Sequence, residues 1–166
     1  MKYLIDSNSL IDADLKWYRP KVFSSVWAFL ANNINIEMSS FVFAEIKYPD
    51  DLRNWTNTNF KTKQVIVNPK MISKYNEVMD WISNCNRWSP AGISQWQSPD
   101  KADPWLIATA MLNNDVIVTM DGNGRATMPD IGSDSSREPK IGAVANQFGV
   151  RTIALYDMLD ELKLNI

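Results

Sequence analysis

Four acidic residues stand beside predicted secondary-structure elements, in positions where carboxylates often serve a site. Asp6 and Asp121 each follow an apolar run typical of a buried strand. Asp103 begins a helical pattern, and Glu45 lies near the end of another. Carboxylates gathered in one pocket repel one another unless protons or cations compensate. A pair of divalent metal ions compensates and also supplies hydrolytic chemistry at phosphorus, because one ion activates water and the other stabilises the leaving oxygen.

The stretch Ala102–Asp121 predicts a helix, a tight connection and a buried strand. Asp103 precedes Pro104, which is tolerated at the first position of a helix because its missing N–H would be unpaired there. Taken alone, Asp103 is explained as an ordinary helix cap. The apolar residues of Leu106–Met111 recur at helical spacing, and Val116–Val118 is a β-branched run suited to a strand covered on both faces. Both acids of this stretch are therefore expected at one edge of an α/β sheet, where such folds usually bind ligands.

Strands alternate with helices along the rest of the chain, which predicts a three-layer α/β/α fold with a central, mainly parallel sheet. Strands are expected at 2–6, 35–39, 64–67, 116–118 and 152–155. Helices are expected to begin after Asp6 and to cover 21–32, 41–46, 51–59, 71–85, the segment from 103 to the Asn113-Asn114 break, 140–148 and 156–164. With no repeat or linker, residues 1–166 are expected to form a single domain.

Two segments have no clear period. Gly122–Lys140 holds three glycines, three serines and two prolines, which predicts a mobile surface loop. Trp88, Trp96 and their neighbours predict an ordered but irregular segment, with core packing favoured over base stacking for the tryptophans.

Composition removes several classes of chemistry. The chain has no histidine, which excludes Ser-His-Asp catalysis and histidine zinc sites. Its single cysteine excludes an internal disulfide framework and fits a reducing cytoplasm, the expected location. No apolar run approaches the roughly 20 residues that cross a bilayer, so no membrane partner is expected. A net charge of -2 argues against a broad basic face for nucleic acid, although a local patch remains open.

Four sequence segments resemble the PIN domain, a nuclease fold. They are DSNSLIDA near the start, FVFAEIK around Glu45, ADPWLIATA and VIVTMD. The match to ADPWLIA is closest to a bacterial PIN subfamily, and more broadly the chain is similar to toxin ribonucleases of VapC type. The resemblance covers the first fifty residues and residues 100–164.

The resemblance implies site residues by position. Asp6, Glu45 and Asp103 take the positions of the three usual metal-binding acids, and Asp121 takes that of a more variable fourth. Asp6, Glu45, Asp103 and Asp121 are thus the expected catalytic and metal-binding set, and Mg²⁺ or Mn²⁺ is the expected cofactor. Ser7 and Asn8 match a pair that supports the first acid by hydrogen bonding. The chain departs from the family after Asp121, where a glycine-rich loop replaces the usual acid and aromatic residue.

The resemblance also implies an activity and partners. It implies a metal-dependent endoribonuclease that hydrolyses single-stranded RNA to leave a 5′-phosphate and that acts as the toxin of a type II toxin–antitoxin system. A homodimer and a cognate antitoxin protein are the expected partners besides RNA. Arg125, Arg137 and Lys140 are candidate phosphate contacts, with solvated surface charge as the default interpretation.

Three alternatives to a single-strand ribonuclease were considered, and the first two of them stay open. A PIN-fold nuclease with DNA or a structured RNA such as tRNA as its substrate fits the same residues. A non-catalytic binding module of the same fold fits them if the acids bind no metal. A phosphate-receiver domain fits poorly, because the first strand lacks the paired acids that it needs.

Overall fold

The sheet of the protein is parallel throughout. The computed structural model describes residues 1–124 and 127–165, and within these residues five strands follow the order β3-β2-β1-β4-β5. Their bounds are β1 (Tyr3–Ile5), β2 (Ile36–Ser39), β3 (Gln64–Val65), β4 (Val116–Val118) and β5 (Thr152–Ile153). The two central strands, β1 and β4, are apolar and buried at every position because helices cover both faces. They pair in register from Tyr3–Val116 to Ile5–Val118, so their carboxyl ends lie side by side.

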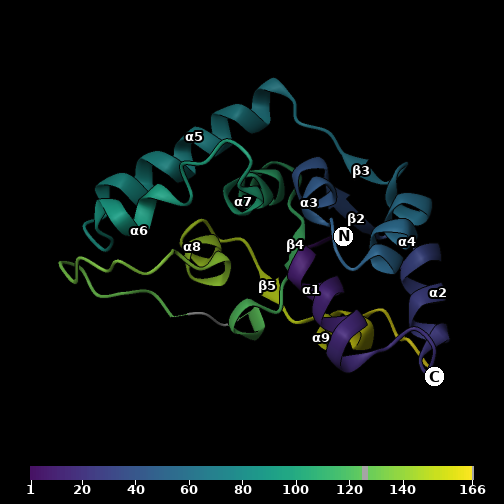
Figure 1. Ribbon diagram of the computed structural model, residues 1–166. Coiled ribbons are helices and arrows are strands. Elements are labelled where there is room, and N and C mark those ends of the chain that lie inside the picture. The colour runs from purple at the N-terminus through teal and green to yellow at the C-terminus, as the bar shows by residue number, and fades with distance from the viewer. Residues whose placement is uncertain (125–126, 166) are drawn as a thin grey trace.

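Helices cover the two faces of this sheet (Figure 1). One face carries α1 (Ser7–Asp12), α2 (Ser24–Asn32), α4 (Asp50–Phe60) and α9 (Leu155–Glu161). The other carries α7 (Ala102–Asn113) and α8 (Ile141–Gln147), with α5 (Pro69–Asn84) packed outside α7 and α3 (Ser40–Glu45) beside it. A π-helix, η1 (Ala13–Trp17), continues α1, and two short elements, α6 (Pro90–Ser94) and the 3-10 helix η2 (Asp121–Gly124), lie in connections.

The predicted three-layer architecture with a mainly parallel sheet is therefore confirmed. All of the expected strands and long helices are present, with ends shifted by a few residues. Trp96 is completely buried and Trp88 nearly so, as expected for core residues. Among the described residues, the helices are all too short or too polar to cross a membrane.

Helix α7 is buried almost all the way round because it lies between the sheet and α5. Its start corrects one prediction. The helix begins at Ala102 with Lys101 as its N-cap residue, so Pro104 is the third helical residue and Asp103 is not the cap. Proline is still tolerated there, because the first four N–H groups of a helix have no partner within it. The Asp103 side chain is thereby released from capping and faces Lys101 instead.

Residues 127–140 lie largely at the surface, as predicted, and backbone hydrogen bonds join this segment to the residues before α6. Ser89 N–H donates to Ser135 O at 2.9 Å, and Ser135 N–H donates to Arg87 O at 3.0 Å. This parallel bridge brings the segment against α6, where a Cβ on Gly92 would lie 2.5 Å from Ser135 O. Glycine is required at this approach, and we call residues 127–140 the anchored strap.

A buried cluster of three carboxylates

Asp6 lies at the junction of β1 and α1. Its N–H donates to Val118 O at 2.9 Å, which extends the pairing with β4 by one residue. As the N-cap of α1, its Oδ1 accepts from Ser7 N–H at 2.8 Å. Its Oδ2 accepts from the Thr119 hydroxyl at 3.0 Å. Both carboxylate oxygens are thus held by the protein, and the residue is 2% exposed.

Glu45 is the last residue of α3 and reaches two other helices. Its Oε2 accepts from the Ser7 hydroxyl at 3.0 Å, and that hydroxyl also lies 3.5 Å from Asp6 Oδ1. Its Oε1 accepts from Ala102 N–H at 3.3 Å, at the first turn of α7. A carboxylate is stabilised there by the free N–H groups and by the helix dipole. Ser7 therefore lies between the first two acids, and Glu45 links them to the start of α7.

Asp103 completes what we call the acid cluster: Asp6, Glu45 and Asp103. Burial raises the pKa of Asp6 to about 7, and the negative charges of Asp103 and Glu45 add to this effect against the opposing hydrogen bonds from Thr119 and Ser7. Burial likewise raises the pKa of Asp103 to about 6, although the Lys101 ammonium opposes it. The three acids are close enough to repel one another, and the neighbouring cation, Lys101, also pairs with Glu138, so the cluster has less positive than negative charge around it.

Lys101 and Glu138 were missed by sequence reasoning. Lys101 Nζ lies 3.2 Å from Asp103 Oδ2 and 2.5 Å from Glu138 Oε1. Burial by itself lowers the pKa of Lys101, but the hydrogen bond to Glu138 and the charges of both acids outweigh it and raise the pKa to about 12. The Lys101 position, two residues before Asp103, was a usable signal. Glu138 offered none, because it lies in the anchored strap and meets Lys101 through the fold alone.

Asn8 and Thr119 connect the cluster to the end of β4. Asn8 Oδ1 accepts from Met120 N–H at 2.9 Å and lies 3.3 Å from the Thr119 hydroxyl. Thr119 is fully buried and was also missed, although a hydroxyl residue directly after a buried strand was visible in the sequence. Its oxygen accepts from Asp121 N–H at 3.1 Å.

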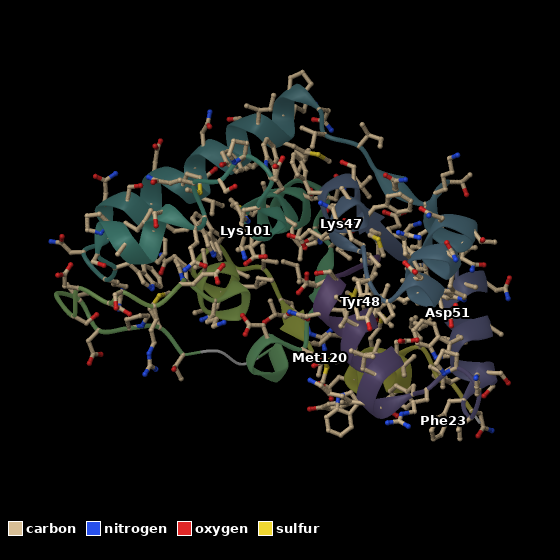
Figure 2. All side chains as sticks on the ribbon, in the orientation of Figure 1. Phe23, Lys47, Tyr48, Asp51, Lys101 and Met120 are labelled. Carbon is tan, nitrogen blue, oxygen red and sulfur yellow. The ribbon has the colours of Figure 1, made fainter. Side chains whose placement is uncertain are left out.

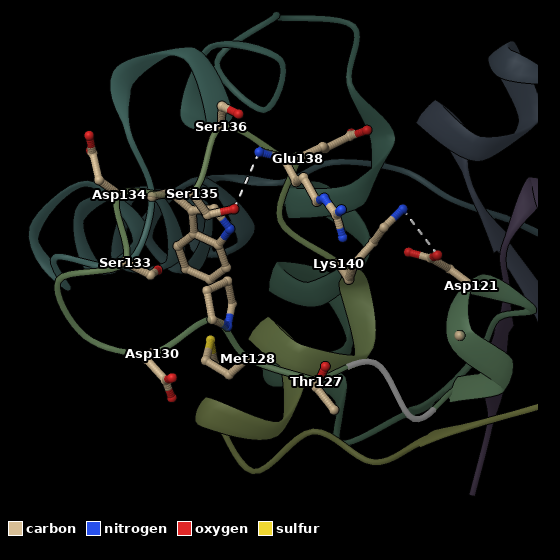
Figure 3. Close-up of a pocket in the computed structure, with 14 residues that line it drawn as sticks. Asp121, Thr127, Met128, Asp130, Ser133, Asp134, Ser135, Ser136, Glu138 and Lys140 are labelled. Carbon is tan, nitrogen blue, oxygen red and sulfur yellow. Dashed lines mark hydrogen bonds and ion pairs between the residues drawn. The ribbon is translucent and has the colours of Figure 1, made fainter.

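The Asp121 carboxylate faces away from this network. Its Oδ1 pairs with Lys140 Nζ at 3.2 Å, at one end of a cavity of about 740 Å³ (Figure 3). Arg137 and Glu138 of the anchored strap line the same cavity. Lys140 thus pairs with an acid and Arg137 is exposed. Arg125, the third candidate phosphate contact, lies outside the described residues.

The donors of the acid cluster suit a hard divalent cation. They are carboxylate oxygens, which Mg²⁺ and Mn²⁺ prefer, and burial, with neighbouring negative charge, raises the pKa of Asp6 and of Asp103. In the described part of the chain, no set of three or more acidic or cysteine side chains is arranged as a ready-made metal site. Ser7 donates to one oxygen of Glu45, and Lys101 pairs with one oxygen of Asp103.

Two solved structures are similar in fold to this chain. One is the crystal structure of VapBC2 from Rickettsia felis bound to a DNA fragment from their promoter, with 19% sequence identity, a TM-score of 0.47, and coverage of 72% of this chain and 86% of that chain. The other is FitAcB from Neisseria gonorrhoeae, with 15% identity, a TM-score of 0.49, and coverage of 91% and 96%. At these TM-scores neither similarity bears on function.

Sequence comparison gives a family but no function. No curated protein matches the chain. The model of one family, described as a domain of unknown function (DUF4411), matches residues 3–166, nearly the whole chain. The protein is therefore a member of the DUF4411 family, with the three-layer α/β/α fold and parallel sheet that its sequence predicts.

Proposed function

We propose that the protein is a metal-dependent endoribonuclease that hydrolyses phosphodiester bonds of single-stranded RNA, as the toxin of a type II toxin–antitoxin pair. One observation carries the hydrolytic part of this proposal. Three carboxylates from the start of α1, the end of α3 and the first turn of α7 meet at the carboxyl edge of a parallel sheet, short of positive charge. Their order along the chain matches the acids of the PIN family.

Asp6, Glu45 and Asp103 would hold Mg²⁺ or Mn²⁺. A divalent ion bound there lowers the pKa of an attacking water and offsets negative charge at the phosphate. The residues around the acids fix their orientation: Ser7 spans Asp6 and Glu45, and Thr119 holds the second oxygen of Asp6. Asp121 takes part in the proposal as an auxiliary acid, since its carboxylate pairs with Lys140.

Cleavage of an unstructured, end-labelled RNA tests the activity. The protein should cut it with Mg²⁺ or Mn²⁺ and stop when EDTA is added. Asp103→Asn, which keeps the size of the side chain, should abolish cleavage. Asp80→Asn, at an exposed acid of α5, is the matched control and should leave it unchanged. Equal rates for Asp103→Asn and the parent protein would exclude this mechanism.

The substrate class is tested by competition. Unlabelled single-stranded RNA should compete most strongly with the labelled RNA, ahead of single-stranded DNA and folded tRNA. Stronger competition by DNA or by tRNA would identify that nucleic acid as the substrate, with the same acid cluster as the proposed site.

The partners of the proposal are a second copy of the chain and an antitoxin protein, and both rest on the sequence resemblance. Trp17 and Tyr156 are 57% and 47% exposed and line a hollow of about 270 Å³ with Leu155 and Met120. Exposed apolar side chains of this size suit a protein contact. Light scattering should give the mass of a dimer, and Trp17→Ser should reduce it if this face forms the contact.

A non-catalytic binding module is the second candidate, and Lys101 is the observation in its favour. Its ammonium already supplies a cation to Asp103 and Glu138. Calorimetry of the folded protein separates the two candidates: heat of Mn²⁺ binding that disappears in Asp103→Asn supports the nuclease, and no heat supports the binding module.

A further inference from the structure

Three aromatic rings form a stack beside the acid cluster. The rings of Phe41 and Trp105 are nearly parallel, at 4° and 4.9 Å between centroids. Tyr75 stacks on Trp105 with 4.1 Å between centroids and an angle of 20°. The rings come from α3, α7 and α5, and each is partly exposed rather than sealed in the core.

A cavity of about 400 Å³ opens at the Phe41 end of this stack. Its lining residues are Ser40, Phe41, Ala44, Glu45, Lys47 and Asp100. One face of the Phe41 ring is stacked on Trp105, and the partly exposed ring also lines the cavity. Binding pockets for small ligands range from about 300 to 1,000 Å³, so the cavity has room for one nucleotide.

This cavity adjoins the acid cluster through Glu45. Glu45 lines it and also accepts hydrogen bonds from Ser7 and Ala102. Phe41 precedes Glu45 by four residues on α3, so the two side chains lie on one side of the helix, a turn apart. Trp105 follows Asp103 by two residues on α7. The helices that carry the second and third acids therefore carry the aromatic rings as well.

Lys47 gives the cavity a cation. It is exposed, lines the cavity, and stands two residues after the end of α3. Lys47 and Lys101 are both labelled in Figure 2, near α3 and α7. A flat aromatic face with a nearby ammonium suits a nucleobase and its phosphate, because every base has a π-face and every linkage carries one negative charge.

We propose that this cavity binds one unpaired nucleotide of the RNA substrate, with its base stacked on Phe41 and its phosphate beside Lys47. The next phosphodiester bond then lies on the Glu45 side, at the acid cluster. A base in a duplex has both faces covered by its neighbours, so such a subsite selects single strands. Stacking reads no hydrogen-bond pattern, so the subsite tolerates different bases. This inference rests on the proposed function and names how that site holds its substrate.

An abasic scan tests the subsite without relying on cleavage. Labelled single-stranded RNA oligonucleotides, each with one abasic residue at a successive position, are titrated with the full-length protein in EDTA, and anisotropy gives Kd. In the parent protein, one abasic position should weaken binding about tenfold, the effect of losing one stacked base. In Phe41→Ala, intact RNA should bind about tenfold more weakly, and the same abasic position should have no further effect.

Phe41→Tyr and Val22→Ala are the controls. Phe41→Tyr keeps a stacking face and should retain the abasic effect, which separates stacking from a general loss of structure. Val22 is an exposed apolar residue that does not line the cavity, and Val22→Ala should keep both the affinity and the abasic effect. A parent protein that binds and cleaves RNA but shows a flat abasic scan overturns the subsite and leaves the proposed function in place. A parent protein that shows neither binding nor cleavage overturns both.

The salt dependence of binding tests Lys47 separately. For single-stranded nucleic acid, the slope of log K against log salt changes by about 0.7 for each phosphate that the protein no longer neutralises. Lys47→Gln should lower the slope by this amount. The loss of affinity at the sensitive abasic position should stay the same, because Phe41 is still present. An unchanged slope removes Lys47 from the proposal.

Discussion

Asp6 and Asp121 follow two adjacent parallel strands, yet the protein uses them differently. Asp6 comes directly after β1, is buried, and has both carboxylate oxygens bonded to Ser7 and Thr119. Asp121 comes three residues after β4 and begins the 3-10 helix η2, with its carboxylate on Lys140. Both acids therefore reach the carboxyl edge of the sheet because they follow a strand. The turn after each strand, α1 for Asp6 and η2 for Asp121, determines the direction of the side chain.

Thr119 is the residue at which the two regions meet. Its hydroxyl donates to Asp6 and accepts from the backbone N–H of Asp121. The side chain of Asp6 is therefore held by the same hydroxyl that holds only the main chain of Asp121. We therefore expect substitution of Asp6 to have a larger effect than substitution of Asp121.

Cleavage rates should separate the two acids most strongly. Asp6→Asn should lower kcat at least about a hundredfold, the scale of losing a preorganised charge at a reacting centre. Asp121→Asn should lower it less than about tenfold, because its carboxylate is engaged by Lys140. Single-turnover assays on the same RNA measure both. Equal losses would place Asp121 inside the acid cluster in the working enzyme.

The stability of the metal-free protein should fall as the pH rises. Burial and neighbouring charges raise the pKa of Asp6 from 3.8 to about 7 and that of Asp103 from 3.8 to about 6. The folded state then retains protons that the unfolded chain releases, so the stabilisation is complete below pH 3.8 and is lost as the pH passes 6 to 7. The slope is about 1.4 kcal/mol per pH unit for each proton.

Urea unfolding in EDTA between pH 4 and 8 measures this slope. Asp6→Asn should reduce the slope by about one proton. A protein whose metal-free stability rises over this range would contradict the raised pKa values.

Thr119→Val should lower the free energy of unfolding by about 1–3 kcal/mol, since it leaves a buried carboxylate oxygen without its donor. The Thr119 hydrogen bond lowers the pKa of Asp6, so its removal should also raise that pKa further. Thr119→Ser keeps the hydroxyl and serves as the control in the same urea titration. If valine and serine destabilise equally, the change in methyl packing and not the hydroxyl is responsible.

Of these four predictions, the effect of Lys101→Met should be the smallest, and it concerns the affinity for the metal ion. Removal of an ammonium 3.2 Å from Asp103 takes away a positive charge that repels a divalent ion, so Mn²⁺ should bind roughly tenfold more tightly. Calorimetry measures the Kd, with Lys74→Met on the exposed face of α5 as the control. Weaker Mn²⁺ binding by Lys101→Met would show that the lysine orders the carboxylates rather than competing with the metal.

The sequence predicted the elements better than it predicted the contacts between them. Apolar periodicity located β1, β4 and the long helices, because burial of a face imposes that pattern. The sequence argument took Pro104 as the first residue of α7, although it is the third. A proline is tolerated throughout the first turn, so its position did not fix the start of the helix.

Backbone hydrogen bonds, and ion pairs between residues far apart in the sequence, produce no recognisable sequence pattern. The anchored strap is held by main-chain bonds to Arg87 and Ser89, which any side chains allow. The pairing of Lys101 with Glu138 joins two otherwise ordinary polar residues. The order of Asp6, Glu45 and Asp103 was informative because their elements are recognisable, and the structure brings these three together.

The pairing of β1 with β4 also sets when the site is completed during synthesis. The Thr119 hydroxyl that holds Asp6 is made 113 residues after it. At about 5–20 residues per second, that interval lasts roughly 6–23 s. Asp103 is also made before β4, so a nascent chain holds all three acids before Thr119 is available to fix Asp6. The acid cluster therefore reaches its full set of hydrogen bonds only after β4 has been made and has paired with β1.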